Sequence, residues 1–428
     1  MVSGAVKIKS LFWLILIFLT ATNLAFAAVK EESIADSLRQ KAQAGDVYSQ
    51  LKLGEEFLYG VNRSRNLNLA FYYFNMAAEQ GSDVGNFYVG YCHEYGYGVT
   101  KNIFKAYSYY EKAISLDEAK FKVALILERG LRGAKIDGKY YGSIDQNKVR
   151  AKELQDFLIS KKYPPAMVNL AEKLLKNRNI TPESGQYIFE LLSEAAEQND
   201  VQAKKYLIDC YLEGIGTAVN EEQAFKEAYK LYTAEVKGVA GKLGLFYERG
   251  IGVAPDMLEA IKFYQIAADE GEGFAKVKIA EQHLSGFYLK TDVEKALKLL
   301  HEEMRNNNGA AIKILADCFL KGIGLEKDEK QAFLFYLRSA GLGDVAAQYE
   351  LANCFRNGVG TQIDESAVFF WAKQGSSVGD IDCMRLLAEC YAHGIGTPKE
   401  IKTAERLLIA CVKAGDDKAA LLLKRGLE

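Results

Sequence analysis

Apolar residues recur every three or four positions along most of the chain, and this spacing predicts amphipathic helices. In the segment 343–377, Tyr349, Ala352 and Phe355 lie on one face of a predicted helix, with polar residues opposite. A second helix follows, with Asp364 placed to be its N-cap. Since each helix spans about 12 to 14 residues, the segment is expected to form a helical hairpin.

A glycine-centred block between the two helices recurs with a spacing of 36 residues. Its first glycine is expected to end helix A, the first helix of each unit, in a left-handed conformation, and a second glycine permits a tight reversal into helix B. The repeat glycines are Gly60, Gly96, Gly130, Gly214, Gly250, Gly286, Gly322, Gly358 and Gly394. The register breaks once, between Gly130 and Arg178, because extra residues lie near 131–146.

This period predicts an all-α fold, an α/α superhelix (solenoid) of about ten 36-residue helix-turn-helix repeats over residues 36–428. Seven residues before the glycine every unit carries an apolar residue, such as Leu53 or Leu351, and the next position is mostly glycine or alanine. No isolated helix pair can bury such faces, so each repeat is expected to stack on its neighbours.

These positions resemble the Sel1-like repeat family, whose pattern is A-x-x-x-L-G-x-x-Y-x-x-G-x-G-V, then D-x-x-K-A, then two alanines and a glycine. Lys105-Ala106, Ala77-Ala78 and Ala267-Ala268 supply parts of the second half. The resemblance covers essentially all of residues 36–426. It implies a superhelix related to tetratricopeptide arrays that binds other proteins, and it implies no catalytic residue.

Residues 1–27 differ from the repeats, because Lys7 and Lys9 precede an apolar run from Leu11 to Leu19, and the following segment ends in Ala25-Phe26-Ala27. This order is typical of a secretory signal peptide cleaved after Ala27, which leaves 28–35 as a short N-terminal segment. An uncleaved membrane anchor is the alternative, although the apolar core is shorter than the ~20 residues of a span. We therefore expect an exported protein, periplasmic or secreted and bacterial, with no integral membrane segment in the mature chain.

Seven cysteines in an exported chain raise the question of disulfides. Five of them occupy the position four before the repeat glycine and are expected to be buried: Cys92, Cys210, Cys318, Cys354 and Cys390. Cys383 and Cys411 lie near the start of one helix and the end of its antiparallel partner, so we predict a disulfide between them. The same two positions are bridged in the cysteine-rich proteins of the resembled family.

Composition argues against several function classes. The net charge is −2, with 26% charged residues, so nucleic acid is not an expected partner. The Gly-x-Gly blocks join two helices, whereas a phosphate loop follows a strand. His93 and His283 occupy a packing position, and no metal-ligand or catalytic spacing is found. We expect neither enzymatic activity nor a cofactor.

Two features are candidate binding sites. The position five before the glycine carries Asp209, Glu281, Asp317, Asn353 and Glu389, which would form an acidic ladder for a basic or amine-bearing ligand if helix A lines the binding face. The alternative is an ordinary solvated helix face. The insertion 131–146, with Tyr140-Tyr141-Gly142, is either a second contact or a tolerated surface insertion.

The leading hypothesis is a monomeric, exported scaffold that binds a protein or peptide along its superhelical groove, in envelope assembly, signalling regulation or host interaction. One alternative is the binding or processing of a cell-wall-type or β-lactam-like ligand, to which cysteine-rich relatives have been linked. Another is an adaptor of the eukaryotic endoplasmic reticulum, in which Asn62-Arg63-Ser64 and Asn179-Ile180-Thr181 would be glycosylation acceptors.

Overall fold

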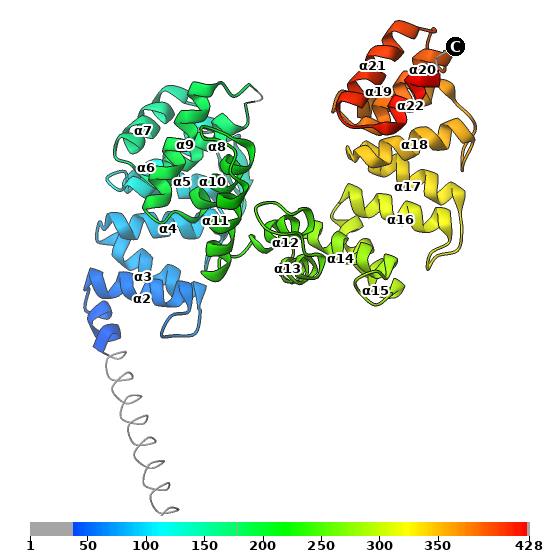
Figure 1. Ribbon diagram of the computed structural model, residues 1–428. Coiled ribbons are helices and arrows are strands. Elements are labelled where there is room, and N and C mark those ends of the chain that lie inside the picture. Colours follow the sequence, from blue (N-terminus) through cyan, green and yellow to red (C-terminus); the bar gives the residue numbers. More distant parts are fainter. Residues whose placement is uncertain (1–36, 178, 426–428) are drawn as a thin grey trace, which may run out of the picture. The chain divides into compact units, whose positions relative to one another are not determined.

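The computed structural model describes residues 37–177 and 179–425 (Figure 1). The predicted signal peptide and its cleavage site lie outside these residues. The chain divides into two compact units, unit 1 up to Tyr206 and unit 2 from Leu207 onward. Both units are built from alternating A and B helices, as the periodicity predicts.

Unit 1 begins with a helical segment at 37–43, followed by four A/B pairs. Its A helices are α2 (Val47–Tyr59), α4 (Asp83–Tyr95), α6 (Asp117–Arg129) and α8 (Pro164–Leu175). Its B helices are α3 (Leu67–Glu79), α5 (Ile103–Lys112), α7 (Lys148–Ser160) and α9 (Pro182–Glu197). Each of these helices packs on the next along the chain, so the A helices form one layer and the B helices another.

The A helix α10 (Val201–Glu213) contains the boundary between the units. The A helices that follow are α12 (Ala240–Arg249), α14 (Gly273–Ser285), α16 (Gly309–Lys321), α18 (Val345–Asn357) and α20 (Ile381–His393). The B helices are α11 (Glu221–Thr233), α13 (Met257–Asp269), α15 (Val293–Arg305), α17 (Glu329–Gly341), α19 (Glu365–Ser377) and α21 (Ile401–Lys413), and α22 (Asp417–Arg425) packs on α21. Within the described residues, no helix is both long and apolar enough to cross a membrane.

The helix ends confirm the capping predictions. Asp364 lies just before α19 and its carboxylate accepts a hydrogen bond from the Ala367 amide at 3.0 Å. Gly358 ends α18 at φ 72° and ψ 26°, in the left-handed region, and its amide donates to the Cys354 carbonyl. Each cap satisfies a backbone group that the helix itself leaves unpaired.

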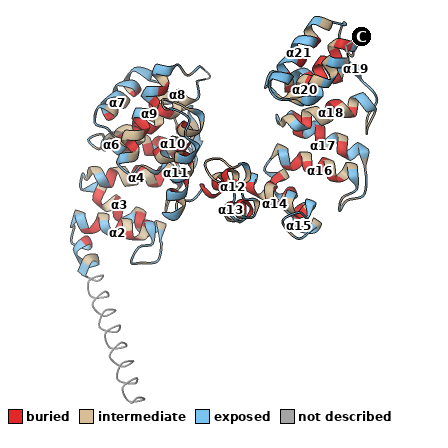
Figure 2. Cartoon of the chain, in the orientation of Figure 1, coloured by how far each residue is buried: buried red, intermediate tan, exposed pale blue. Residues whose placement is uncertain are grey.

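The core is made by small residues of A helices facing large residues of B helices. A Cβ atom at Gly54 would lie 2.4 Å from the Phe74 ring, and one at Gly244 would lie 2.6 Å from the Tyr264 ring. Phe74 and Tyr264 are almost completely buried. Figure 2 shows the buried residues concentrated on the helix faces that meet within each unit. The glycine or alanine position predicted from the sequence therefore leaves room for an aromatic ring of the B helix.

Where the block has its second glycine, as at Gly98, Gly252, Gly360 and Gly396, that glycine brings the turn against the preceding repeat. A Cβ at Gly360 would lie 2.0 Å from the Glu329 carbonyl oxygen at the start of α17. The matching position in the first pair is Asn62, which keeps the left-handed conformation at φ 62°. No helix pair precedes it among the described residues, so a side chain is tolerated there. Glycine is required by the contact between repeats as well as by φ.

The fold is all-α as predicted, apart from the insertion, which forms a β-hairpin that the sequence analysis did not predict. Strands β1 (Ala134–Ile136) and β2 (Lys139–Tyr141) pair antiparallel, and Leu131 and Ile144 form a further bridge. Gly130 also departs from its prediction: at φ 67° and ψ 171° it lies outside the left-handed helical region, because the chain leaves α6 into an extended segment.

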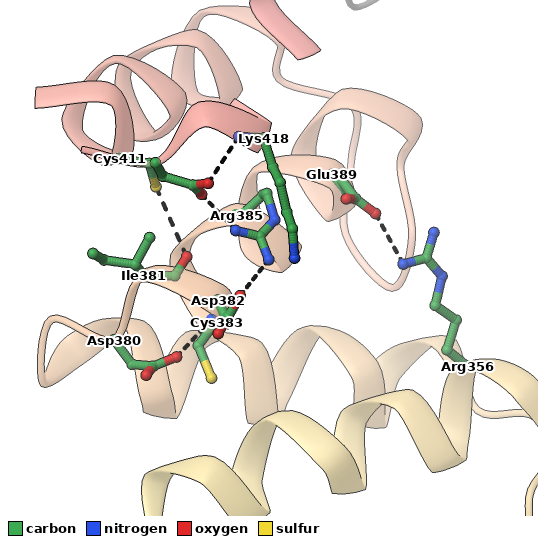
Figure 3. Close-up of polar contacts among 10 residues, drawn as sticks. Arg356, Asp380, Ile381, Asp382, Cys383, Arg385, Glu389, Cys411 and Lys418 are labelled. Atoms are coloured by element: carbon green, nitrogen blue, oxygen red, sulfur yellow. Dashed lines mark hydrogen bonds and ion pairs between the residues drawn. The ribbon is translucent and has the colours of Figure 1, made fainter. Parts of the chain in front are cut away.

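The predicted disulfide between Cys383 and Cys411 is absent from the structure, in which all seven cysteines are free. The Cys383 side chain packs on Gly375 of α19, where a Cβ atom would lie 2.2 Å from the Cys383 sulfur. The Cys411 sulfur instead lies 3.9 Å from the Ile381 carbonyl oxygen (Figure 3). The two thiols serve different packing contacts, although their helices lie side by side.

The other five cysteines are buried, as predicted from their position before the repeat glycine. Burial raises the pKa of Cys92 and of Cys210 to about 12. Burial likewise raises the pKa of Cys318, Cys354 and Cys390 to about 11. These thiols therefore act as small apolar core residues.

Candidate protein-interaction face

The surface of the A helices is the candidate site, and in unit 1 it carries a cluster of tyrosines. We call Tyr59, Tyr88, Tyr91, Tyr95 and Tyr97 the tyrosine cluster. The Tyr91 ring centroid lies 4.6 Å from that of Tyr95 and 5.9 Å from that of Tyr97. Tyr59 is 60% exposed and Tyr95 45% exposed, so aromatic surface from α2, α4 and the following turn is open to a partner.

The partly buried tyrosines hold the cluster in place. The Tyr88 ring stacks on Phe74 with centroids 4.3 Å apart, and its hydroxyl donates to Glu55 Oε1 at 3.0 Å. Burial and the nearby Glu55 carboxylate raise the pKa of Tyr88 well above its usual value. The hydroxyl therefore remains a hydrogen-bond donor at physiological pH, and the contact ties α4 to α2.

Cations frame the exposed end of this cluster. Lys122 Nζ of α6 donates to Glu94 Oε1 at 3.0 Å and lies 5.4 Å from the Tyr95 ring centroid. Arg65 lies over the Tyr97 ring at 5.7 Å. Glu94 also accepts a hydrogen bond from the Tyr110 hydroxyl of α5. Rigid aromatic surface with a charged rim is the composition that dominates protein–protein binding energy.

In unit 2 the same face carries an alternating ladder of charges. Three of the five residues predicted as an acidic ladder are already engaged: Asp209 with Lys242 at 2.5 Å, Asp317 with Lys313 at 2.8 Å, and Glu389 with Arg356 at 2.9 Å. Figure 3 shows the last of these pairs, which joins α18 to α20. Asp317 also accepts from the Tyr336 hydroxyl at 2.5 Å.

A further pair belongs to this ladder and was not predicted. Lys278 donates to Glu248 at 2.8 Å, and Glu248 also accepts from the Tyr264 hydroxyl. Burial opposes the charge of Glu248, but these two hydrogen bonds hold its pKa below the usual value. The ladder therefore links α10 to α12, α12 to α14 and α18 to α20, with cations interspersed among the acids.

Glu281 and Glu350 are the acids of this face on which burial prevails. Glu281 is exposed by surface area, yet surrounding protein atoms desolvate its carboxylate, and with Glu248 and Asp317 nearby its pKa is raised. Desolvation and Asp317 raise the pKa of Glu350 in the same way. Asn353, the fifth predicted ladder residue, hydrogen-bonds Glu350 and carries no charge. Among the predicted carboxylates, Glu281 is therefore the one that a basic group of a ligand would stabilise most, because the group would offset the repulsion from Glu248 and Asp317.

The tyrosine cluster has a signal in the sequence, which is its position relative to the repeat glycines. Tyr91 occupies the position five before its glycine, the same position as the predicted acids, and Tyr59 and Tyr95 both stand one residue before theirs. Two positions four residues apart on a helix share one face. The two positions together therefore mark this surface, whereas the high tyrosine content alone suggests core packing.

Two cavities lie away from the tyrosine cluster. One of about 660 Å³ is lined by charged residues of both signs at the first repeat, including Lys41, Lys52 and Glu56. The other, of about 710 Å³, lies between the turns around Lys327 and Gly360. No group of three or more potential metal ligands occurs in the part of the chain that the structure describes. Neither cavity holds an arrangement typical of catalysis.

Two of the histidines, His93 and His283, contact the turns that follow their helices. His93 is buried, and its Nδ1 lies 3.5 Å from the Thr100 carbonyl oxygen. His283 is also buried, and its Nδ1 lies 3.0 Å from the Lys290 carbonyl oxygen. Burial lowers the pKa of His93. Both rings therefore brace the turn between an A helix and its B helix.

The family described as Sel1 repeat matches more than half of the chain. The matched segments are residues 47–82, 84–118, 209–226, 241–272, 275–302, 310–344, 345–380 and 381–416. None of them covers 119–208, where the hairpin and the most degenerate unit lie. The structure nevertheless continues the A/B alternation through that stretch.

Individual relatives share part of this chain. Chitin synthase regulatory factor 3 of Schizosaccharomyces pombe is 30% identical over 260 residues, covering 52% of this chain and 28% of that protein. The uncharacterized protein NMB1327 of Neisseria meningitidis serogroup B is 26% identical over 264 residues, covering 60% of this chain and 51% of the relative. The chain thus spans between about a quarter and a half of the curated relatives it matches.

Among solved structures, c5321, a protective antigen of uropathogenic Escherichia coli with an SLR fold, aligns with a TM-score of 0.51 and 21% identity. The alignment covers 90% of this chain and 88% of that one. At this identity the likeness concerns the fold.

Proposed function

Because this chain belongs to the Sel1 repeat family, whose members generally mediate protein–protein interactions, we propose that it is a non-enzymatic scaffold that holds a protein or peptide partner on its A-helix face. The observation that carries this proposal is the tyrosine cluster of α2 and α4. Tyr59 and Tyr95 expose aromatic surface, while hydrogen bonds and stacking fix their neighbours. Because these side chains are already ordered, binding a partner would cost little side-chain entropy on this surface.

Site-specific photo-crosslinking in the native cell tests this proposal. A benzoylphenylalanine in place of Tyr95 should trap a defined partner, and one in place of Tyr187 should not. Tyr187 is the matched control because it is 43% exposed, close to the 45% of Tyr95, but lies on the B helix α9 of the same unit. The partner should also be lost on Tyr91→Ala. Identical products at both positions, or none at Tyr95, would refute the assignment of the face.

The compartment forms a second part of the proposal. We propose that residues 1–27 direct export and that the mature chain starts at Ala28, supported by the charged, apolar and small-residue order of that segment. Cell fractionation followed by N-terminal sequencing tests this. A chain that starts at Met1 and stays in the cytoplasm would overturn it without affecting the interaction face.

A further inference from the structure

The hairpin and its flanks form a strongly basic stretch in a chain that carries a net negative charge outside it. Residues 129–152 contain seven lysines and arginines and two aspartates, a net charge of +5, whereas the whole chain has −2. We call this stretch the basic hairpin segment. It comprises the end of α6, strands β1 and β2, and the start of α7. Such a concentration of charge creates a local positive field that attracts anionic partners.

The base of the hairpin is fixed to the repeat array. The Tyr141 ring stacks on Phe104 of the B helix α5, with centroids 5.6 Å apart. Leu131 and Ile144 exchange two backbone hydrogen bonds, of 2.7 and 2.9 Å, and Ile144 packs against the core of this repeat. Asn147 then donates its backbone N–H to the Leu127 carbonyl at 2.8 Å. The hairpin is therefore held at a defined position on the protein.

Its tip and outer side face solvent without internal compensation. Arg132, Lys135 and Lys139 are exposed, and Tyr140 is 71% exposed. Over residues 37–177 and 179–425, none of these three cations forms an ion pair; Lys139 lies over the Tyr141 ring at 5.6 Å. Elsewhere in unit 1, by contrast, Arg150 is paired with Glu111 and Lys122 with Glu94. The unpaired cations repel one another, so an anionic partner would lower the electrostatic free energy.

The backbone of the hairpin is also open to pairing. Asp137 and Gly138 form its two-residue turn, both with positive φ, so the closing pair Ile136 and Lys139 is a hydrogen-bonded pair. Hydrogen-bonded and non-hydrogen-bonded pairs alternate along an antiparallel ladder. The next pair, Lys135 with Tyr140, therefore directs its backbone N–H and C=O groups outward. Both edges of this sheet are free of a third strand in the described chain.

We propose that the basic hairpin segment is a second docking surface, separate from the A-helix face, and that it binds an acidic, extended protein segment by strand addition to the hairpin edge. Outward backbone groups of Lys135 and Tyr140 pair with the strand, and Arg132, Lys135 and Lys139 neutralise its carboxylates. An exposed sheet edge recognises polypeptide backbone, which neither a nucleic acid nor a membrane presents. This backbone geometry selects an acidic peptide over other polyanions.

Binding of labelled peptides to the purified protein tests the proposal by fluorescence anisotropy. The probe is (Glu-Thr)4 in low salt, which alternates acids along one face of a strand. We expect it to bind, and the triple variant Arg132→Glu, Lys135→Glu, Lys139→Glu to bind about tenfold more weakly or less. The control triple Lys290→Glu, Lys295→Glu, Lys298→Glu changes the net charge equally at exposed sites of unit 2 and should bind as the unaltered protein does.

A second pair of probes separates strand addition from charge attraction alone. (Glu-Thr)4 with alternate backbone nitrogens methylated keeps its charge but loses the strand hydrogen bonds, and it should bind about tenfold more weakly. Equal binding of the methylated peptide, or equal weakening by the control triple, would overturn the proposal. So would equal affinity for an eight-residue oligothymidylate or for phosphatidylglycerol vesicles. Because Tyr91 and Tyr95 are untouched, this result is independent of the A-helix face.

Discussion

Arg385 and Asp416 form a buried ion pair between α20 and the start of α22, with Nη1 donating to Oδ2 at 2.5 Å and each side chain 9% exposed. Arg385 also donates to Asp382 on its own helix. Asp416 accepts in addition from the Lys418 amide at 3.0 Å. The pair therefore joins α20 to the start of α22, in the terminal repeat where a disulfide between α20 and α21 was predicted.

Removing one partner of this pair should destabilise the C-terminal repeat. Asp416→Ala leaves the Arg385 guanidinium buried without its counter-ion, which costs about 3 kcal/mol. Asp382→Asn is the control: its side chain is 54% exposed, and its loss should cost much less. Hydrogen exchange of α20 to α22 would measure both. Equal protection in the two variants would contradict the importance of the buried pair.

The same pair should make this repeat sensitive to acid. Burial disfavours the charge of Asp416, but hydrogen bonds from Arg385 lower its pKa below the usual value. A carboxylate with a lowered pKa in the folded state adds stability above its unfolded pKa of about 4, and this stability is lost as the pH falls through the folded pKa. The protection of α20 to α22 against hydrogen exchange, relative to the intrinsic exchange rate at each pH, should thus fall below about pH 4, and Asp416→Ala should remove that fall.

Gly375→Ala should destabilise the protein although alanine favours helices. The new Cβ would lie 2.2 Å from the Cys383 sulfur and 2.8 Å from its Cβ, so the α19 and α20 backbones must separate. Overpacking of this kind costs about 1–3 kcal/mol. In the Cys383→Ala background the same change should become neutral or favourable, because an alanine pair occupies the equivalent positions Ala267 and Ala275. Thermal unfolding of the four variants measures this coupling, and additivity would contradict it.

Gly360→Asn should loosen the contact between neighbouring repeats. Asparagine tolerates a positive φ, so the expected loss of about 1–3 kcal/mol arises from the clash of its Cβ with the Glu329 carbonyl. Asn62→Gly makes the reverse change at the first repeat and should alter stability little. Denaturant unfolding tests both variants. No loss at Gly360 would show that the backbone angle rather than the contact decides this position.

All seven thiols should be free yet unreactive in the native protein. Burial raises the pKa of Cys411, as it does for the cysteines before the repeat glycines, so little thiolate forms at pH 8. Titration with a thiol reagent should find none reactive in buffer and all seven in denaturant without reductant. Five reactive thiols in denaturant, together with a linked peptide pair containing Cys383 and Cys411, would restore the disulfide predicted from the sequence.

Glu281→Lys is the sharpest test of the ladder in unit 2. Glu281 has a raised pKa and no ion pair among the described residues, so its reversal should weaken capture of an A-face partner while leaving the melting temperature unchanged. Asp317→Lys should lower both partner capture and the melting temperature, because Asp317 also accepts hydrogen bonds from Tyr336 and Lys313. Unchanged capture in Glu281→Lys would return this position to an ordinary solvated helix face.

The sequence alone determined the repeat, its period and its helical nature, because the signals for these are local. Spacing of apolar residues, the N-cap Asp364 and the C-cap Gly358 all act within one helix or turn, and each lies in the structure where it was predicted. Burial of the five cysteines before the repeat glycines also followed from their shared position, since a repeated position has a repeated environment.

Tertiary structure decided which side chains meet across helices. Cys383 and Cys411 lie on adjacent helices, but packing on Gly375 directs one thiol elsewhere, and no local rule records that. Two of the predicted acids acquired cationic partners from neighbouring repeats some thirty residues away, Lys242 for Asp209 and Arg356 for Glu389. The tyrosine cluster likewise depends on a contact between repeats, the hydrogen bond from Tyr88 of α4 to Glu55 of α2. Side-chain direction and partner choice are set by packing, which a one-dimensional period does not contain.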